Sequence, residues 1–242
     1  METIAHRGNV ARAPENTMAA FRSAIDLGVD MVEMDLQLTR DGAVVVVHDE
    51  ELGRTVPGKG QVQERTLVQL QELDAGGWFA PAFAGERIPT LEQVLDLFKP
   101  TPVQINLELK TNQIPYPGLA ERVVAQVLEQ GMEEQVILSS FNHETLRAVQ
   151  QITRKIPCAA LFSLRLLEPW EYLARYDFQA LHVMRHGCTP EVVRECQARG
   201  FQVRVWTVNE EPEARRLAGM GVDGIITNDP AALMGWARDW NK

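Results

Sequence analysis

The chain has 242 residues, 45% of them hydrophobic, which suits one large domain with a full apolar core. It contains no run of 18 or more apolar residues, and Met1–His6 lacks a basic head followed by an apolar stretch, so we expect no membrane anchor, no signal peptide and a cytoplasmic location. The net charge of −9 opposes nonspecific binding to nucleic acid or anionic membranes, so the expected partner is a small molecule, and nothing in the sequence indicates an oligomeric state.

The predicted elements begin with a strand and a helix of ordinary length. The strand covers Thr3–His6, and the helix covers Asn16–Leu27 and ends at Gly28, a common helix stop. Two strands follow, over Met31–Leu38 and Ala43–His48. An Asp-Gly pair separates them, which is a strong signal for a hairpin turn.

Residues 49–89 break this pattern, because they are rich in glycine and proline turns and show little strand character. We interpret them as a small insertion within a single domain that covers 1–242. After the insertion, strands and helices alternate to the end of the chain. The further predicted strands are Val103–Leu109, Val136–Ser139, Cys158–Phe162, Ala180–Val183, Gln202–Thr207 and Gly224–Thr227. The helices are Gly118–Glu129, His143–Ile152, Glu168–Arg175, Pro190–Arg199, Glu211–Ala218 and Pro230–Trp240.

Short strands that alternate with helices indicate parallel β-α units. With the insertion set aside, the chain allows about 25 residues for each of eight units, the lean end of the range for a (β/α)₈ barrel. We therefore predict an α/β protein with this barrel and an insertion after the second strand. The odd set of cysteines, Cys158, Cys188 and Cys196, lacks metal-ligand spacing, and we expect buried, reduced thiols.

Ionisable residues gather at the carboxyl ends of the predicted strands, where the active site of such a barrel lies. These residues are His6, Arg7, Glu33, Asp35, His48, Glu108 and Lys110. Their placement over four strands predicts one shared pocket.

Glu33 and Asp35 are two residues apart in a strand, so their side chains share a face. Two adjacent carboxylates repel each other unless a cation or a proton lies between them. Mg²⁺ or Ca²⁺ suits such oxygen ligands, and Mn²⁺ is also hard enough. Glu108 on a neighbouring strand is a candidate third ligand. The alternative is that these are ordinary surface carboxylates.

His6 and His48 suit general acid/base catalysis near neutral pH, although a single histidine is more often structural. Arg7 and Lys110 bring positive charge for a phosphate group, or for salt bridges to the nearby carboxylates. A cation, two positive side chains and two imidazoles together predict a metal-dependent site for a phosphate ester.

With these residues in view, the chain resembles the glycerophosphodiester phosphodiesterase family, and in particular its bacterial cytoplasmic members. The motifs that carry the resemblance span nearly the whole chain in order. They are His6-Arg7-Gly8, Pro14-Glu15-Asn16-Thr17, Glu33-Met34-Asp35, Asp41-Gly42, His48-Asp49, Glu86-Arg87-Ile88-Pro89-Thr90-Leu91, Asn106-Leu107-Glu108-Leu109-Lys110, Ser139-Ser140-Phe141, Val205-Trp206-Thr207-Val208-Asn209 and Gly221-Val222-Asp223-Gly224-Ile225-Ile226-Thr227.

The resemblance implies a TIM barrel that hydrolyses glycerophosphodiesters to glycerol 3-phosphate and an alcohol. It also implies the mechanism proposed for the family, in which the substrate's own glycerol hydroxyl attacks phosphorus and water then opens a cyclic phosphate. The implied roles are metal ligation by Glu33, Asp35 and Glu108, acid/base catalysis by His6 and His48, phosphate binding by Arg7 and Lys110, and contact with the glycerol carbons by Phe141 and Trp206.

Several alternatives stay open at this point. The substrate could be a lysophospholipid or a sphingomyelin-like lipid, with Trp78, Phe79 and Phe83 of the insertion as apolar contacts, or the barrel could bind glycerol phosphate without catalysis. Asn16 and Thr17 open a helix, so an N-cap is their simplest role, although Asn16 could also steady the His6 loop. Phe141 and Trp206 could also be ordinary core residues. His182 and His186 depart from the family pattern, and we expect structural or surface roles for them.

Overall fold

The computed structural model of the protein describes residues 1–240. Eight parallel strands form one sheet whose first and second strands also pair, so that within these residues the sheet closes into a barrel. The strands are β1 (Glu2–His6), β2 (Met31–Leu38), β4 (Gln104–Leu109), β5 (Val136–Ser140), β6 (Cys158–Phe162), β7 (Ala180–Met184), β8 (Gln202–Trp206) and β9 (Gly224–Thr227). The predicted (β/α)₈ barrel is confirmed.

A ninth strand, β3 (Val44–Val46), pairs antiparallel with the end of β2. This is the predicted hairpin, but β3 is shorter than the expected strand over residues 43–48. The Val47 N–H still donates to the Asp35 carbonyl at 3.0 Å, but the carbonyls of Val47 and His48 both accept from the Gln37 side chain.

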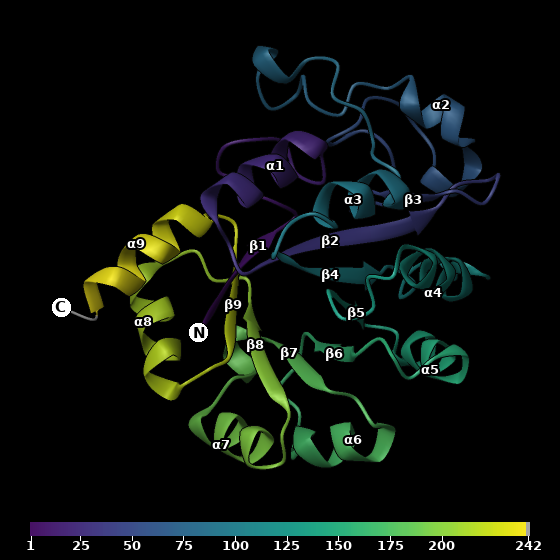
Figure 1. Ribbon diagram of the computed structural model, residues 1–242. Coiled ribbons are helices and arrows are strands. Elements are labelled where there is room, and N and C mark those ends of the chain that lie inside the picture. Colours follow the sequence, from purple (N-terminus) through teal and green to yellow (C-terminus); the bar gives the residue numbers. More distant parts are fainter. Residues whose placement is uncertain (241–242) are drawn as a thin grey trace.

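Helices surround the barrel, as Figure 1 shows. They are α1 (Met18–Leu27), α3 (Leu91–Phe98), α4 (Leu119–Gln130), α5 (His143–Ile152), α6 (Pro169–Tyr176), α7 (Pro190–Ala198), α8 (Glu211–Met220) and α9 (Pro230–Trp240). All were predicted to within two residues at each end except α3, which the sequence analysis missed. Thr90 caps α3 in a capping box with Gln93, a signal that was present in the sequence.

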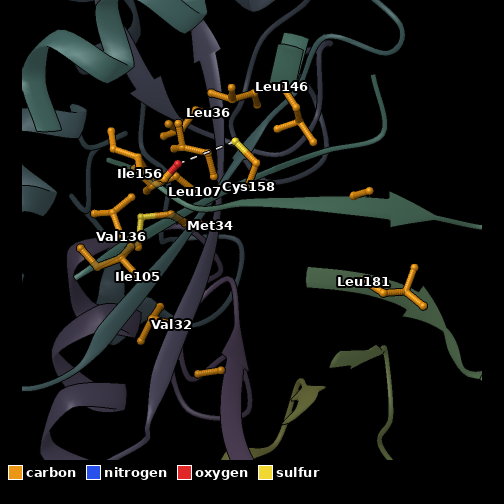
Figure 2. Close-up of a cluster of buried hydrophobic side chains, with 14 of the residues drawn as sticks. Val32, Met34, Leu36, Ile105, Leu107, Val136, Leu146, Ile156, Cys158 and Leu181 are labelled. Carbon is orange, nitrogen blue, oxygen red and sulfur yellow. Dashed lines mark hydrogen bonds between the residues drawn. The ribbon is translucent and has the colours of Figure 1, made fainter. Parts of the chain in front are cut away.

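Side chains alternate between two sides of each strand. Those that point outward form the main core against the helices, and Figure 2 shows part of it around β2 and β4, with Val32, Met34 and Leu36 near Ile105 and Leu107. Those that point inward at the amino ends form a smaller apolar cluster. It consists of Ile4, Met31, Ile137, Ala159, Ala180 and Ile226.

Two residues further along, the inward positions of four of these strands are polar, whereas that of β6 is Leu161. The four polar residues are His6, Glu33, Ser139 and His182. The apolar cluster is thus a floor, and the polar side chains above it lie toward the carboxyl ends of the strands. The fold therefore places the predicted site residues in one location.

Residues 49–89 contain one short α-helix, α2 (Leu67–Gln71), and two 3₁₀ turns, Val62–Glu64 and Pro81–Phe83. Their apolar side chains pack into a second core with two valines of β3 and its flank. This core consists of Val45, Val47, Val56, Val62, Leu70, Ala75 and Ile88. The description of this segment as an insertion stays a prediction, which the separate core supports.

Over residues 1–240, no helix is long and apolar enough to cross a bilayer. All three cysteines are buried and unpaired, as expected.

Candidate active site

Eight of the nine predicted site residues line one cavity of about 120 Å³ at the carboxyl end of the barrel. The ninth, Asp35, is 1% exposed and lies against the same group of side chains. Four residues to which the sequence analysis gave no role in the site also line the cavity. They are Asn106, Leu161, Thr207 and Ile226.

Three carboxylates meet beside this cavity. Glu33, Asp35 and Glu108 each offer an oxygen, and these oxygens all lie within 4.8 Å of one another. The strand register explains the meeting, because Asp35 of β2 pairs with Glu108 of β4 and Glu33 lies two residues earlier on the same face of β2.

The electrostatics of the three carboxylates fit a cation. Burial and the charges of Asp35 and Glu108 raise the pKa of Glu33 well above its usual value. Burial and the Asp35 charge likewise raise the pKa of Glu108 to about 7. The oxygens Asp35 Oδ1 and Glu108 Oε1 are buried and have no hydrogen-bond partner among residues 1–240. A divalent cation would supply the missing partner and relieve the repulsion, so this donor set suits Mg²⁺, Ca²⁺ or Mn²⁺.

Positive side chains flank the carboxylates. Lys110 Nζ lies 3.9 Å from Asp35 Oδ1 and 3.8 Å from Glu108 Oε1. Arg7 Nε lies 3.4 Å from Asp35 Oδ2, and the Arg7 backbone N–H donates to Glu33 at 3.0 Å. Although burial raises the pKa of Asp35, the charges of Arg7, His48 and Lys110 hold it well below the usual range. Both Arg7 and Lys110 also line the cavity, so salt bridges and phosphate binding can coexist in this site.

The two histidines are each held through Nδ1. His6 Nδ1 lies 2.7 Å from Asn228 Oδ1, and His48 Nδ1 lies 2.7 Å from Asp49 Oδ1. Because amide and carboxylate oxygens only accept, each Nδ1 donates, and the neutral form of each ring would present Nε2 as a proton acceptor. His6 Nε2 lies 3.9 Å from Glu33, and burial together with the Arg7 charge lowers the pKa of His6 to about 4.

Three residues that the sequence analysis did not assign join these groups. Arg54 donates to Asp49 at 2.5 and 3.0 Å and to Glu15 at 2.7 and 2.8 Å. Glu15 in turn accepts from Arg7 at 2.9 Å. The motif around Glu15 was recognised, but no pattern in the sequence shows which cation it contacts.

The expected N-cap role falls to Thr17 alone, whose side chain accepts from the Ala20 N–H. Asn16 lies just before the cap, in a left-handed conformation at φ 55°, and its side chain donates to Asp35 at 2.8 Å. It therefore holds a carboxylate of the site and does not cap the helix.

His182 and His186 lie in different environments. His182 points into the barrel, is fully buried, and has no hydrogen-bond partner for either ring nitrogen among residues 1–240. His186 is exposed and lines a separate cavity of about 510 Å³ with Arg185, Glu213 and Arg216. Neither residue lines the cavity that holds the carboxylates.

Comparison with known proteins extends this picture. The family model described as "Glycerophosphoryl diester phosphodiesterase family" matches residues 6–232. A protein from Caldanaerobacter subterraneus subsp. tengcongensis named glycerophosphodiester phosphodiesterase is 42% identical over 97% of both chains. One of the same name from Bacillus altitudinis is 38% identical over 94% of both.

Solved structures agree with the sequence matches. A phosphodiesterase from Oleispira antarctica, in complex with the product sn-glycerol-3-phosphate, has a TM-score of 0.89 and 30% identity. The match covers 98% of this chain and 97% of that one.

Proposed function

The chain belongs to the glycerophosphoryl diester phosphodiesterase family, and on this premise we propose that it hydrolyses glycerophosphodiesters to glycerol 3-phosphate and an alcohol. The observation that carries the proposal is the single cavity at which three carboxylates, two histidines and two positively charged side chains meet. Each group matches a need of phosphoryl transfer, namely charge stabilisation, proton transfer and phosphate binding.

We propose that Glu33, Asp35 and Glu108 hold one divalent cation, which would stabilise negative charge on the phosphoryl oxygens. Arg7 and Lys110 would bind the remaining phosphate oxygens, since both line the cavity with fixed positive charge. Phe141 and Trp206 pack edge to face, with ring centres 5.4 Å apart, and would form the apolar wall against the glycerol carbons.

Proton transfer is assigned to the two imidazoles. His6 is neutral at pH 7 because burial and Arg7 disfavour its cation, so its Nε2 can take the proton from the attacking hydroxyl. His48 has the Asp49 carboxylate beside Nδ1, which stabilises an imidazolium, so His48 can give the proton to the leaving oxygen. The roles reverse when water completes the hydrolysis.

The direct test is release of glycerol 3-phosphate from glycerophosphocholine, glycerophosphoethanolamine and glycerophosphoglycerol with Mg²⁺, Ca²⁺ and Mn²⁺ in turn. We expect turnover that chelation abolishes and that metal restores. A double variant, Glu33→Gln with Asp35→Asn, should stay inactive after metal is added back. Wild-type turnover by the chelated double variant would disprove the metal assignment, and no turnover of any substrate would favour a binding protein.

A lipid phosphodiester is the second candidate substrate. Within residues 49–89, Phe79 packs edge to face on both Trp78 and Phe83, and Trp78 is 45% exposed. They do not belong to the apolar clusters of residues 1–240, which leaves apolar surface for an acyl chain. Faster turnover of lysophosphatidylcholine than of glycerophosphocholine would establish the lipid activity.

The cytoplasmic location of the protein remains a prediction, and fractionation of cells would test it.

A further inference from the structure

A continuous chain of charged contacts links the two halves of the proposed site around its outside. It runs from the His48 imidazole through Asp49, Arg54 and Glu15 to the Arg7 guanidinium. The contacts within it measure between 2.5 and 3.0 Å, and each joins an ionisable side chain to a carboxylate, so every link is a charge-assisted hydrogen bond. Arg54 is the central link and the only member that contacts both carboxylates.

The geometry of Arg54 is two-sided. Its Nε and Nη2 donate to the two oxygens of Asp49, and Nη1 and Nη2 donate to the two oxygens of Glu15. All three nitrogens of the guanidinium are thereby used, and both carboxylates are held in a plane. A lysine could not reproduce this arrangement, because an ammonium is a point charge without a fork.

The backbone of Arg54 is anchored. Thr55 and Val56, which follow it, are both buried, and Val56 belongs to the small core of residues 49–89. Glu15, by contrast, belongs to the loop between β1 and α1 of the barrel. Through its hydrogen bonds to Glu15, Arg54 thus connects the segment 49–89 to the loop that carries Arg7.

The Arg54 side chain is 47% exposed. Ion pairs at such exposure contribute little to folding stability, typically about 0–1 kcal/mol. The network is therefore poorly explained as a stabilising device. Its ends are an imidazole and a guanidinium that face the same cavity, which is the arrangement expected of a residue that orients catalytic groups.

We propose that Arg54 is a positioning residue that sets the orientation of His48 through Asp49 and of Arg7 through Glu15. The expected changes in kcat rest on the proposed function. The expected changes in the His48 tautomer and in phosphate binding do not. The hydrogen bonds from Arg54 through Asp49 affect proton transfer, because they fix the His48 tautomer. The hydrogen bonds from Arg54 through Glu15 affect phosphate binding, because they fix the orientation of the Arg7 guanidinium.

Five variants test this division: Arg54→Ala, Arg54→Lys, Asp49→Asn, Glu15→Gln and the control Arg87→Ala. Arg87 is a matched control because it also lies in residues 49–89 but donates only to the Leu73 carbonyl among the hydrogen bonds described for residues 1–240. Thermal unfolding of each variant shows whether the fold survives, and kinetics are then measured well below the unfolding midpoint.

We expect Arg54→Ala to lower kcat and to weaken inhibition by inorganic phosphate, each by about 10- to 100-fold. Asp49→Asn should mainly lower kcat, and Glu15→Gln should mainly weaken phosphate inhibition. Arg54→Lys should restore only part of the loss. The double variant Arg54→Ala with Glu15→Gln should bind phosphate no more weakly than Arg54→Ala alone, because both changes break one chain.

A second readout does not depend on turnover. Nitrogen NMR of the His48 ring should show a proton on Nδ1 in the wild type and in Arg87→Ala, and a mixture of tautomers in Arg54→Ala. If the enzyme assay fails for every substrate, the proposed function falls, while the His48 tautomer and the binding of inorganic phosphate measured by calorimetry still decide this inference. Unchanged tautomer and unchanged phosphate affinity in a folded Arg54→Ala protein would overturn it.

Discussion

At the scale of single residues, the site depends on which atom each side chain presents. Both histidines donate from Nδ1, to Asn228 and to Asp49, and thereby direct Nε2 away from those partners. Arg7 has φ 57°, a left-handed conformation that costs about 1–3 kcal/mol for a residue with a side chain. This turn lets the Arg7 backbone donate to Glu33 while its guanidinium reaches Asp35 and Glu15.

Removal of either imidazole tests the acid/base assignment. His6→Ala and His48→Ala should each lower kcat by about 10²–10⁴, the usual contribution of a positioned general acid or base. The control is His186→Ala, since His186 is exposed and does not line the carboxylate cavity. Steady-state rates on glycerophosphocholine measure the effect. A His6 variant within a factor of about three of the wild type would remove that residue from the mechanism.

The sequence predicted the seven central residues because they lie at the ends of parallel strands, and strand ends of a barrel converge. It could not predict the roles of Arg54 and Asn228, because these depend on contacts with Glu15 and His6, which are far away in the chain. His6 and Asn228, for instance, are 222 residues apart. Only the closure of β9 against β1 brings them together.

At the scale of elements, most strands and helices followed from hydrophobic period and turn residues. The missed helix α3 lies directly after residues 49–89, where the irregular pattern obscured its start. Its apolar residues Leu91, Val94, Leu95 and Phe98 have helical spacing and are buried. The end of β3 could not be foreseen, because the carbonyls of Val47 and His48 accept from the Gln37 side chain, a contact that no sequence pattern indicates.

The turn between β1 and α1 provides a test of how closely the backbone must approach the helix. Gly8 has φ 89°, and a Cβ there would lie 2.7 Å from Ala20 Cβ and 2.9 Å from the Ala20 carbonyl carbon. Gly8→Ala should lower the free energy of unfolding by roughly 2–4 kcal/mol, from backbone strain together with overpacking.

Gly28 is the matched control for this substitution. It has φ 76° at the end of α1, but a Cβ there would meet nothing within 4 Å. Gly28→Ala should therefore cost only the left-handed strain, about 1–2 kcal/mol. Urea unfolding of both variants gives the comparison. Equal losses would mean that the contact with Ala20 is relieved by a small backbone shift.

At the scale of the whole molecule, the barrel concentrates buried charge at one end. Three carboxylates with oxygens within 4.8 Å of one another oppose folding unless a cation or a proton lies between them, so folding and metal binding should be coupled. A divalent cation at about 100 times its dissociation constant should stabilise the fold by roughly 2.7 kcal/mol. Thermal unfolding with and without Mg²⁺ or Mn²⁺ measures this. Glu33→Gln with Asp35→Asn should abolish the shift, and an equal shift in that variant would place the metal elsewhere.

The interior of the barrel also couples stability to pH through His182. Burial, with a smaller effect of the Arg204 charge, lowers the pKa of His182 well below 6.5. In the unfolded chain the same imidazole titrates near 6.5. Between these two values the unfolded state binds more protons than the folded state, so the free energy of unfolding falls as pH is lowered below about 6.5.

His182→Gln removes this titration while keeping a polar side chain in the barrel. The free energy of unfolding of the variant should fall less steeply between pH 6.5 and 5, by up to about 1.4 kcal/mol per pH unit. His6, whose pKa is also lowered by burial, titrates in both proteins, so the difference in slope isolates His182. Urea unfolding at half-unit pH steps measures the two slopes, and above pH 7.5 they should coincide. Equal slopes below pH 6.5 would mean that His182 is protonated in the folded barrel, with water supplying partners for its two unpaired ring nitrogens.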